Sequence, residues 1–343
     1  MTWPPPPAEV ALDRIPEVRA ERVGPPGGET RPSGSARERS AMSDIIVHHY
    51  RESPYAEKIR LILGFKRLAW RSVIIPMIMP KPDLTALTGG YRKTPVLQLG
   101  ADIYCDTDLI SRTIERLQPE PTLFADGSAA LSYMLGAWQG ELFWLAVRTV
   151  GTSAPVFPPG FIEDRATMVE GGLSLERVLR DAPAQREQLR AKLDLLDAHL
   201  RERRFVLGAR PSLADFSLFH PVWPLKIVPQ TTAILEPFTH LRAWMERVGA
   251  FGHGQITEIE GKEAVEVARQ ATPRTETRAD PGEPNGLTPG DRVEVVHESF
   301  GRDPVAGELA ASSVQEIAVR RRDERAGEVV VHFPREHYVV RRV

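Results

Sequence analysis

The stretch RESPYAEKIRLIL, residues 51–63, directly follows the apolar run DIIVHHY of residues 44–50, and together they predict a strand followed by a helix. Serine is favoured at a helix N-cap and proline at the first helical position, so Ser53 and Pro54 mark the start of a helix over 54–65. A helix N-terminus carries partial positive charge and free N–H groups that stabilise a thiolate, and a hydroxyl there can donate to the sulfur. Two interpretations of Ser53 stay open on this pattern alone: a helix cap, or a cap that also activates a thiol.

The elements that follow continue in the order β-α-β, then a loop or short helix, then β-β-α. We expect a β-branched strand at 70–76, a hairpin of two strands at 94–100 and 101–105 around a glycine-centred turn, and a helix at 106–117.

The middle of the chain has helical periodicity throughout. We expect helices in the ranges 129–150, 183–205, 211–225, 240–250 and 263–271. Ser212 and Asp215 have the spacing of a capping box, which we assign to folding. After the linker at 272–290, short β-branched runs punctuated by Gly and Pro predict a small all-β module of about five strands, a barrel.

Composition limits the classes of function. With 343 residues the chain is too long for one ordinary domain, and its net charge of −2 provides no field that would recruit nucleic acid. The single cysteine, Cys105, excludes an intramolecular disulfide framework and a cysteine-based zinc cluster. No apolar run reaches the roughly 18–20 residues of a membrane span. We therefore expect a cytoplasmic protein with neither nucleic-acid nor membrane partners.

Residues 1–42 are rich in proline and glycine and have no apolar periodicity, which is typical of a disordered tail. Met42 lies just before the first strand, so the tail is either an arm of the native protein or an upstream segment preceding the natural start.

Three stretches in order, SPYAEKIRLIL (53–63), KTPVLQLGADIYCDTDLISRTIERL (93–117) and SLADFSLF (212–219), resemble the cytosolic glutathione S-transferases, with omega- and tau-like features at the N-terminal motif. The resemblance runs from about Asp44 to Pro273 and implies an α+β multi-domain protein. The expected parts are a disordered tail at 1–42, a thioredoxin-like βαβαββα domain at 43–120, an all-helical domain at 125–273, a linker at 274–286 and an SH3-like barrel at 287–343.

The resemblance implies a serine-type thiol activation. Ser53 falls where such classes keep their hydroxyl, and because serine forms no mixed disulfide, thiol exchange is not expected. Tyr50 lies near the hydroxyl of the tyrosine-type classes and is the reserve candidate; otherwise it is a strand-end aromatic packed on the helix. Trp138, Phe143 and Trp144 lie on the helix that lines the second-substrate pocket in the family, although such aromatic residues are more often core.

The resemblance also implies the residues that bind glutathione. Pro95 matches the family's cis-proline, which presents the Thr94 backbone to the cysteinyl amide, and Lys93 matches a lysine used on a glutathione carboxylate. Asp106 and Thr107 replace the family's usual Glu-Ser pair at a helix start, where they would hold the γ-glutamyl ammonium and carboxylate. Each also has a structural interpretation: a strand-start proline, a solvated lysine and an N-cap pair.

The function that follows is a glutathione transferase acting on a hydrophobic electrophile, with glutathione as co-substrate and a homodimer as the expected assembly. A non-catalytic glutathione-fold binding protein and a glutathione-dependent isomerase or dehalogenase are the alternatives. No metal is expected, because His48 and His49 point to opposite faces of a strand, and His332 and His337 lack partners at ligand spacing.

Overall fold

The computed structural model describes residues 45–154, 156–172 and 174–343, so the predicted tail at 1–42 and the role of Met42 lie outside the described residues. The residues that the structure describes form one compact unit.

The N-terminal part has the predicted βαβαββα order. Its elements are β1 (Ile45–His49), α2 (Pro54–Phe65), β2 (Ala69–Ile74), α3 (Pro82–Thr88), β3 (Val96–Leu99), β4 (Asp102–Cys105) and α4 (Thr107–Leu117). β1 pairs in parallel with β2 and antiparallel with β3, and β3 pairs antiparallel with β4, which is the thioredoxin-like sheet order β2-β1-β3-β4. Strand β1 is buried along its whole length, as its continuous apolar run predicts.

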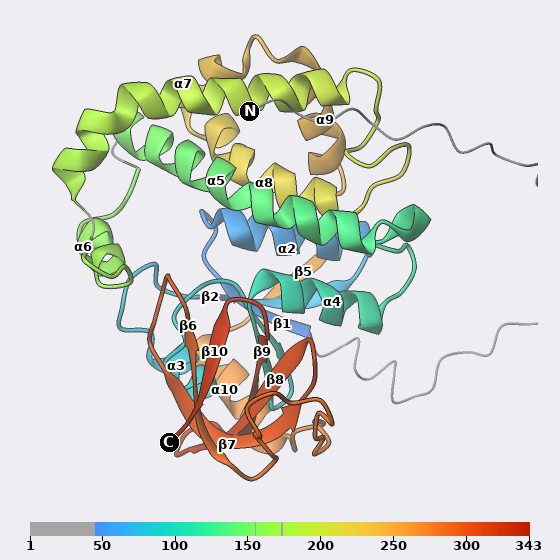
Figure 1. The fold of residues 1–343 in the computed structure, drawn as a ribbon, viewed down its shortest axis with the longest axis vertical. Coiled ribbons are helices and arrows are strands. Elements are labelled where there is room, and N and C mark those ends of the chain that lie inside the picture. The colour runs from blue at the N-terminus through green and yellow to red at the C-terminus, as the bar shows by residue number, and fades with distance from the viewer. Residues whose placement is uncertain (1–44, 155, 173) are drawn as a thin grey trace, which may run out of the picture. The chain divides into compact units, whose positions relative to one another are not determined.

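The helical part begins after a short 3₁₀ segment, η1 (Ala125–Gly127). It contains α5 (Ala129–Ser153), α6 (Phe161–Ala166), α7 (Leu175–Leu200), α8 (Leu213–Ile227), the 3₁₀ helix η2 (Pro229–Leu235) and α9 (Thr239–Gly249). In Figure 1, α5, α7, α8 and α9 lie together above α2. Helix α8 is buried nearly all round and shares one hydrophobic core with α2, α4, α5, α7 and α9, which explains its lack of a polar face.

Asp215 is the polar centre of the helical part. The side chain is fully buried, and its Oδ2 accepts from Ser212 N at 2.8 Å and Ser212 Oγ at 3.1 Å, which completes the predicted capping box. Its Oδ1 accepts from Val206 N and from Trp244 Nε1, each at 2.8 Å. One carboxylate thus ties the start of α8 to the chain before it and to α9.

One strand interrupts the predicted all-helical range 125–273, and the predicted helix at 263–271 follows it. Strand β5 (Gln255–Glu258) pairs in parallel with β2, and helix α10 (Gly261–Gln270) packs against α3 and β9. All four residues of β5 are exposed, so the strand lacks the buried alternation by which a sequence pattern is recognised.

The C-terminal strands extend the thioredoxin-like sheet. They are β6 (Arg292–His297), β7 (Val305–Ser312), β8 (Glu316–Asp323), β9 (Gly327–Pro334) and β10 (Tyr338–Arg342), and the whole sheet has ten strands in the order β10-β6-β7-β8-β9-β4-β3-β1-β2-β5. The five strands occur as predicted. Strand β9 pairs with β4, so the five strands belong to the same sheet as the N-terminal part. The SH3-like barrel and the linker at 274–286 stay predictions.

The junction between β4 and β9 is a parallel pairing in which Tyr104 lies opposite His332. The two rings stack with centroids 4.3 Å apart. His332 Nε2 lies 3.1 Å from Asp102 Oδ1, and His332 Nδ1 lies 2.7 Å from Glu316 Oε1. An imidazole can donate both bonds only when it carries both protons, and these partners raise the pKa of His332 although burial opposes the charge.

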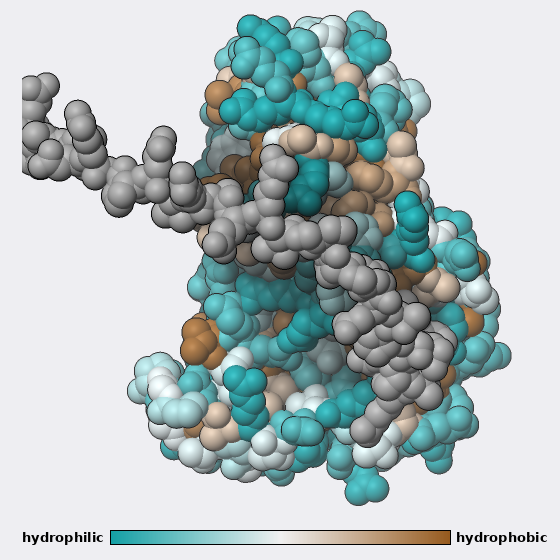
Figure 2. All heavy atoms as spheres, turned by 90° about the vertical axis from the view of Figure 1, so that its right-hand side faces the viewer, coloured by the Kyte–Doolittle hydropathy of each residue, from teal (hydrophilic) through white to brown (hydrophobic). Residues whose placement is uncertain are grey.

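Of the helices in the described part, none combines the length and apolar character that a bilayer crossing requires. Figure 2 shows one face, mostly hydrophilic, with apolar residues gathered over its upper part.

Replacing Asp215 by alanine should lower the free energy of unfolding by about 3 kcal/mol or more, because buried donors lose their acceptor. Chemical denaturation measures this. Asp194→Ala on the exposed face of α7 is the control and should change stability little. A loss equal to that of the control would contradict the assignment of Asp215 as the polar centre.

The β4–β9 junction should make stability depend on pH. The raised pKa of His332 adds stability that is complete below about pH 6.5 and is lost as pH rises through the folded value. The lowered pKa values of Asp102 and Glu316 add stability that is complete above about pH 4.3 and is lost as pH falls through their folded values. The difference in unfolding free energy between wild type and His332→Gln should therefore be largest from about pH 4.5 to about pH 6.5.

Denaturation across pH checks this, with His240→Gln on α9 as a control that should show no such window. A constant difference between wild type and His332→Gln from pH 5 to pH 9 would disprove the role of the imidazolium.

Candidate functional site

Ser53 is the N-cap of α2, as predicted. Its side chain is 2% exposed, and its Oγ accepts from Ala56 N at 3.2 Å. A hydroxyl also carries one proton to donate, and among the described residues the Ser53 proton has no acceptor. Ser53 is therefore a helix cap, as one of the two interpretations predicted. This role uses the hydroxyl oxygen as an acceptor and leaves its proton free to be donated.

Tyr50 is close to Ser53 through the backbone. Its carbonyl accepts from Ser53 N at 3.2 Å and thereby closes the turn between β1 and α2. Lys81 Nζ lies 6.0 Å from the centre of the Tyr50 ring. Burial lowers the pKa of Lys81 to about 8. Tyr50 thus lies beside a cation, whereas Ser53 lies at the helix end itself.

An ion pair between a buried lysine and a half-buried aspartate brings the starts of α2 and α4 together. Lys58, in the second turn of α2, is completely buried, and its Nζ lies 2.8 Å from Oδ1 of Asp108 in the first turn of α4. The carboxylates of Asp106 and Asp108 add to the effect of burial in raising the pKa of Tyr55, which is next to Pro54. Two helix N-termini, each with partial positive charge, therefore face the same region.

Asp106 has an unusual backbone. With φ 75° and ψ 137° it occupies a region that non-glycine residues rarely adopt, and such strain concentrates at functional sites. Its Oδ1 accepts from Asp108 N at 3.1 Å, so it caps α4, and the residue is half-buried. Thr107 is buried at the first position of α4.

Lys93 and Thr94 precede β3. The Thr94–Pro95 peptide bond is cis, as the resemblance implies. Thr94 Oγ1 is buried and has no hydrogen-bond partner among the described residues. Lys93 Nζ lies 5.5 Å from the ring centre of Tyr91 and 4.9 Å from that of Tyr338, and in the described part of the chain it forms no ion pair. Burial lowers the Lys93 pKa to about 8, an effect that the charge of Asp106 partly opposes.

The aromatic residues of α5 divide between two surroundings. Phe143 contacts Tyr55, with ring centres 4.8 Å apart, so it lies over the start of α2. Trp144 meets Phe300 of the C-terminal module edge to face at 5.6 Å. Trp138 instead lies under Lys192 of α7 and belongs to the helical core, as the structural interpretation expects.

The structure thus places Lys93, Asp106 and Thr107 close to one another and the start of α2 beside them. Sequence reasoning missed the contribution of the C-terminal module, namely Tyr338. The alternation in HYVVRRV predicts a strand but cannot indicate which surface the tyrosine meets.

Two features lie apart from this region. A groove of about 410 Å³ lies between residues 167–170 and the C-terminal module, and its lining contains none of the predicted site residues. His48 bonds to Gln98, His49 bonds to Ser72, and burial lowers their pKa values to about 4 and about 3. Among the described residues no cluster of His, Cys, Asp and Glu has the arrangement of a metal site.

Comparison with known proteins identifies the family. Residues 47–122 match the model of the glutathione S-transferase N-terminal domain, and residues 174–247 match that of the C-terminal domain. The crystal structure of a GST-like protein from Pseudomonas syringae is 40% identical, with a TM-score of 0.67, and the alignment covers 88% of this chain and 100% of that one. The chain belongs to the glutathione S-transferase family.

Two further solved structures are less similar to this chain. A glutathione S-transferase from Rhodospirillum rubrum F11 is 20% identical over 60% of this chain and 88% of that one, with a TM-score of 0.48. The beta-etherase LigF from Sphingobium sp. strain SYK-6 is 17% identical over 60% of this chain and 95% of that one, with a TM-score of 0.47. Among curated proteins, none matches this sequence. The Pseudomonas alignment extends past the two glutathione S-transferase domains, since it covers more of this chain than they do.

Proposed function

We propose that this protein is a glutathione transferase of the serine type, which activates the glutathione thiol at the start of α2. The observation that carries the proposal is a buried hydroxyl, that of Ser53, whose proton has no acceptor among the described residues and which lies at a helix N-terminus. A thiol placed there ionises more readily, because the hydroxyl, the N–H groups and the helix dipole all favour the thiolate. The thiolate then attacks an electrophilic carbon, forming a C–S bond as the leaving group departs or the electrons move onto the acceptor.

The rest of glutathione would lie along β3 and the start of α4. Lys93 would bind a carboxylate, the Thr94 backbone would pair with the cysteinyl amide, and Asp106 and Thr107 would hold the γ-glutamyl ammonium and carboxylate. Three observations support this arrangement: Lys93 has no ion-pair partner in the described chain, Thr94 Oγ1 is buried and unpaired, and Asp106 is strained. A polar, anionic ligand would give Lys93 an ion-pair partner and Thr94 Oγ1 a hydrogen-bond partner.

The electrophile would be a hydrophobic molecule beside Phe143 and Trp144, the aromatic residues of α5 that face the start of α2 and the C-terminal module. A homodimer in the cytoplasm is the expected form. The exposed apolar side chains of Leu131 and Met134 on the same helix are surface that a second copy would cover.

Calorimetry with glutathione, combined with turnover assays on a broad panel of electrophiles, tests the proposal. Binding with conjugation supports a transferase. Binding without turnover of any electrophile would favour the non-catalytic binding protein, and turnover confined to isomerisation or dehalogenation would favour the third candidate.

Replacing Ser53 by alanine should lower kcat/KM for conjugation of chlorodinitrobenzene by about 10- to 100-fold, because the thiolate loses its hydroxyl donor. Tyr50→Phe should leave the rate unchanged, since Tyr50 is only the reserve candidate. Full activity in Ser53→Ala would disprove the catalytic assignment.

The loss of a helix cap needs its own control, because a capping serine stabilises by about 1 kcal/mol. Ser174 caps α7 through the same bond, Arg177 N to Ser174 Oγ at 3.2 Å. Ser174→Ala should lower stability as Ser53→Ala does and should leave kcat/KM unchanged.

Lys93 should make the affinity for glutathione depend on pH. With a pKa of about 8, Lys93 is charged at neutral pH and loses its proton above pH 8. The affinity for glutathione should therefore fall above pH 8. S-methylglutathione is the probe, because its blocked sulfur does not titrate. Lys93→Gln should raise the Kd for S-methylglutathione about tenfold at pH 7. The ratio of the Kd values of variant and wild type should fall as pH rises to 9.

Lys192→Gln is the matched control, since Lys192 also lies over an aromatic ring, 5.0 Å from that of Trp138, but on the side of α5 next to α7. A ratio of Kd values between Lys93→Gln and wild type that stays constant from pH 6.5 to pH 9 would contradict the role of the ammonium.

A further inference from the structure

The C-terminal module reaches the candidate glutathione site through the first residue of β10, Tyr338. The side chain is 7% exposed, and its hydroxyl lies 3.3 Å from Asp106 Oδ2 and 3.3 Å from the hydroxyl of Tyr91. An ionised carboxylate only accepts hydrogen bonds, so the Tyr338 proton is the one that serves Asp106. Burial raises the pKa of both tyrosines, which keeps the hydroxyls protonated at neutral pH.

The Tyr338 ring has a second contact, with Lys93. The ammonium of Lys93 lies 4.9 Å from the centre of this ring and 5.5 Å from that of Tyr91, within the range of cation–π attraction. One side chain of the module therefore touches both charged groups that the proposed function assigns to glutathione: the hydroxyl meets Asp106 and the ring meets Lys93.

The loop between β6 and β7 adds a third contact. Gly301 has a φ of +67°, and a Cβ at this position would lie 3.1 Å from Lys93 Cγ, so the loop packs directly on the lysine stem. A side chain at this position would be strained by the backbone conformation and would crowd the lysine stem. The loop thus limits where the Lys93 ammonium can move.

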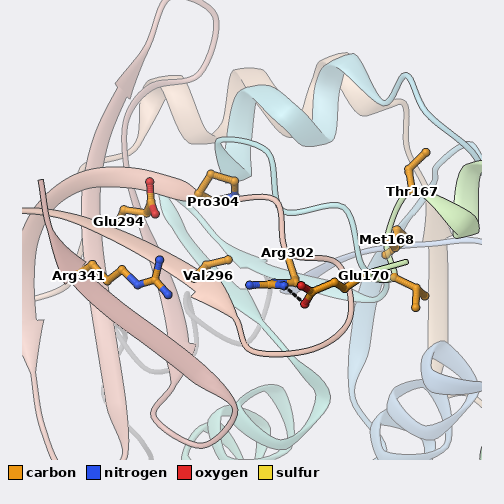
Figure 3. A pocket seen from close by; sticks show the side chains of 9 residues that line it. Thr167, Met168, Glu170, Glu294, Val296, Arg302, Pro304 and Arg341 are labelled. Carbon is orange, nitrogen blue, oxygen red and sulfur yellow. Dashed lines mark hydrogen bonds and ion pairs between the residues drawn. The ribbon is translucent and has the colours of Figure 1, made fainter. Parts of the chain in front are cut away.

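The same loop is attached to the helical part of the chain. Gly301 N donates to Met168 O at 2.9 Å, and Phe300 forms a strand-like bridge with Val169 besides its ring contact with Trp144. Figure 3 shows the neighbouring ion pair of Arg302 with Glu170, at the groove between the two segments. These contacts hold the module in one position beside the site, as does the pairing of β9 with β4.

We propose that the C-terminal module forms part of the glutathione site and that Tyr338 is its positioning residue, holding Asp106 for the γ-glutamyl group and Lys93 for a carboxylate. This inference rests on the proposed glutathione binding. The Tyr338 hydroxyl holds one oxygen of the Asp106 carboxylate in place. Oxygen sites of the carboxylate remain for an ammonium, because an ionised carboxylate accepts about four hydrogen bonds.

The test compares two ligands by calorimetry: glutathione, and cysteinylglycine, which lacks the γ-glutamyl group. Tyr338→Phe removes the hydroxyl and keeps the ring, so the Kd for glutathione should rise about tenfold while that for cysteinylglycine stays within about a factor of two of wild type. Tyr338→Ala removes the ring as well and should weaken both ligands. Thermal unfolding verifies that each variant is folded.

Tyr133→Phe is the matched control, because it removes a hydroxyl that accepts from Arg112 Nε at 3.1 Å and has no contact with Asp106 or Lys93 among the described residues. It should bind both ligands as wild type does. Equal weakening of both ligands in Tyr338→Phe would indicate a merely structural role and overturn the inference, as would unchanged glutathione binding, and either result leaves the proposed function intact. If wild type itself binds no glutathione, the proposed function fails and this inference fails with it.

Discussion

The pairing of β4 with β9 is the constraint on which the arrangement of the candidate site depends. Strand β4 would otherwise end the thioredoxin-like sheet, and its free edge instead takes a parallel partner from near the C-terminus. His332 secures this pairing between Asp102, 230 positions earlier in the chain, and Glu316. Because β10 returns to pair with β6, the same sheet carries Tyr338 back to Asp106 at the start of α4.

Electrostatics of the site depend on helix ends more than on net charge. The ion pair of buried Lys58 with half-buried Asp108 joins α2 to α4 so that two positive helix ends face one region. Lys93 adds a cation that lies over two aromatic rings and is attracted by the nearby Asp106 carboxylate. The candidate site thus contains local positive charge although the whole chain has a net charge of only −2.

Local sequence patterns predicted most helices and strands, because caps, turn residues and hydrophobic periodicity each depend on only a few neighbouring residues. The helix at 54–65 begins and ends where the sequence indicates, since Ser53 and Pro54 mark its start, and the capping box at Ser212 and Asp215 is present. Strand β5 was missed because its residues are all exposed and show no alternation. Helix α10 was correctly predicted as a helix, but only the fold shows that it packs against α3 and β9.

The sequence by itself determined the glutathione S-transferase family, the thioredoxin-like order of elements and the set of polar residues at the starts of α2, β3 and α4, because short motifs encode caps, turns and helix starts. The tertiary structure alone decided that the C-terminal strands join the same sheet and that Tyr338 reaches Asp106, 232 positions away. The physical reason is that strand pairing depends on backbone hydrogen bonds, which nearly any residue can make, so no local pattern specifies which edge a strand will join.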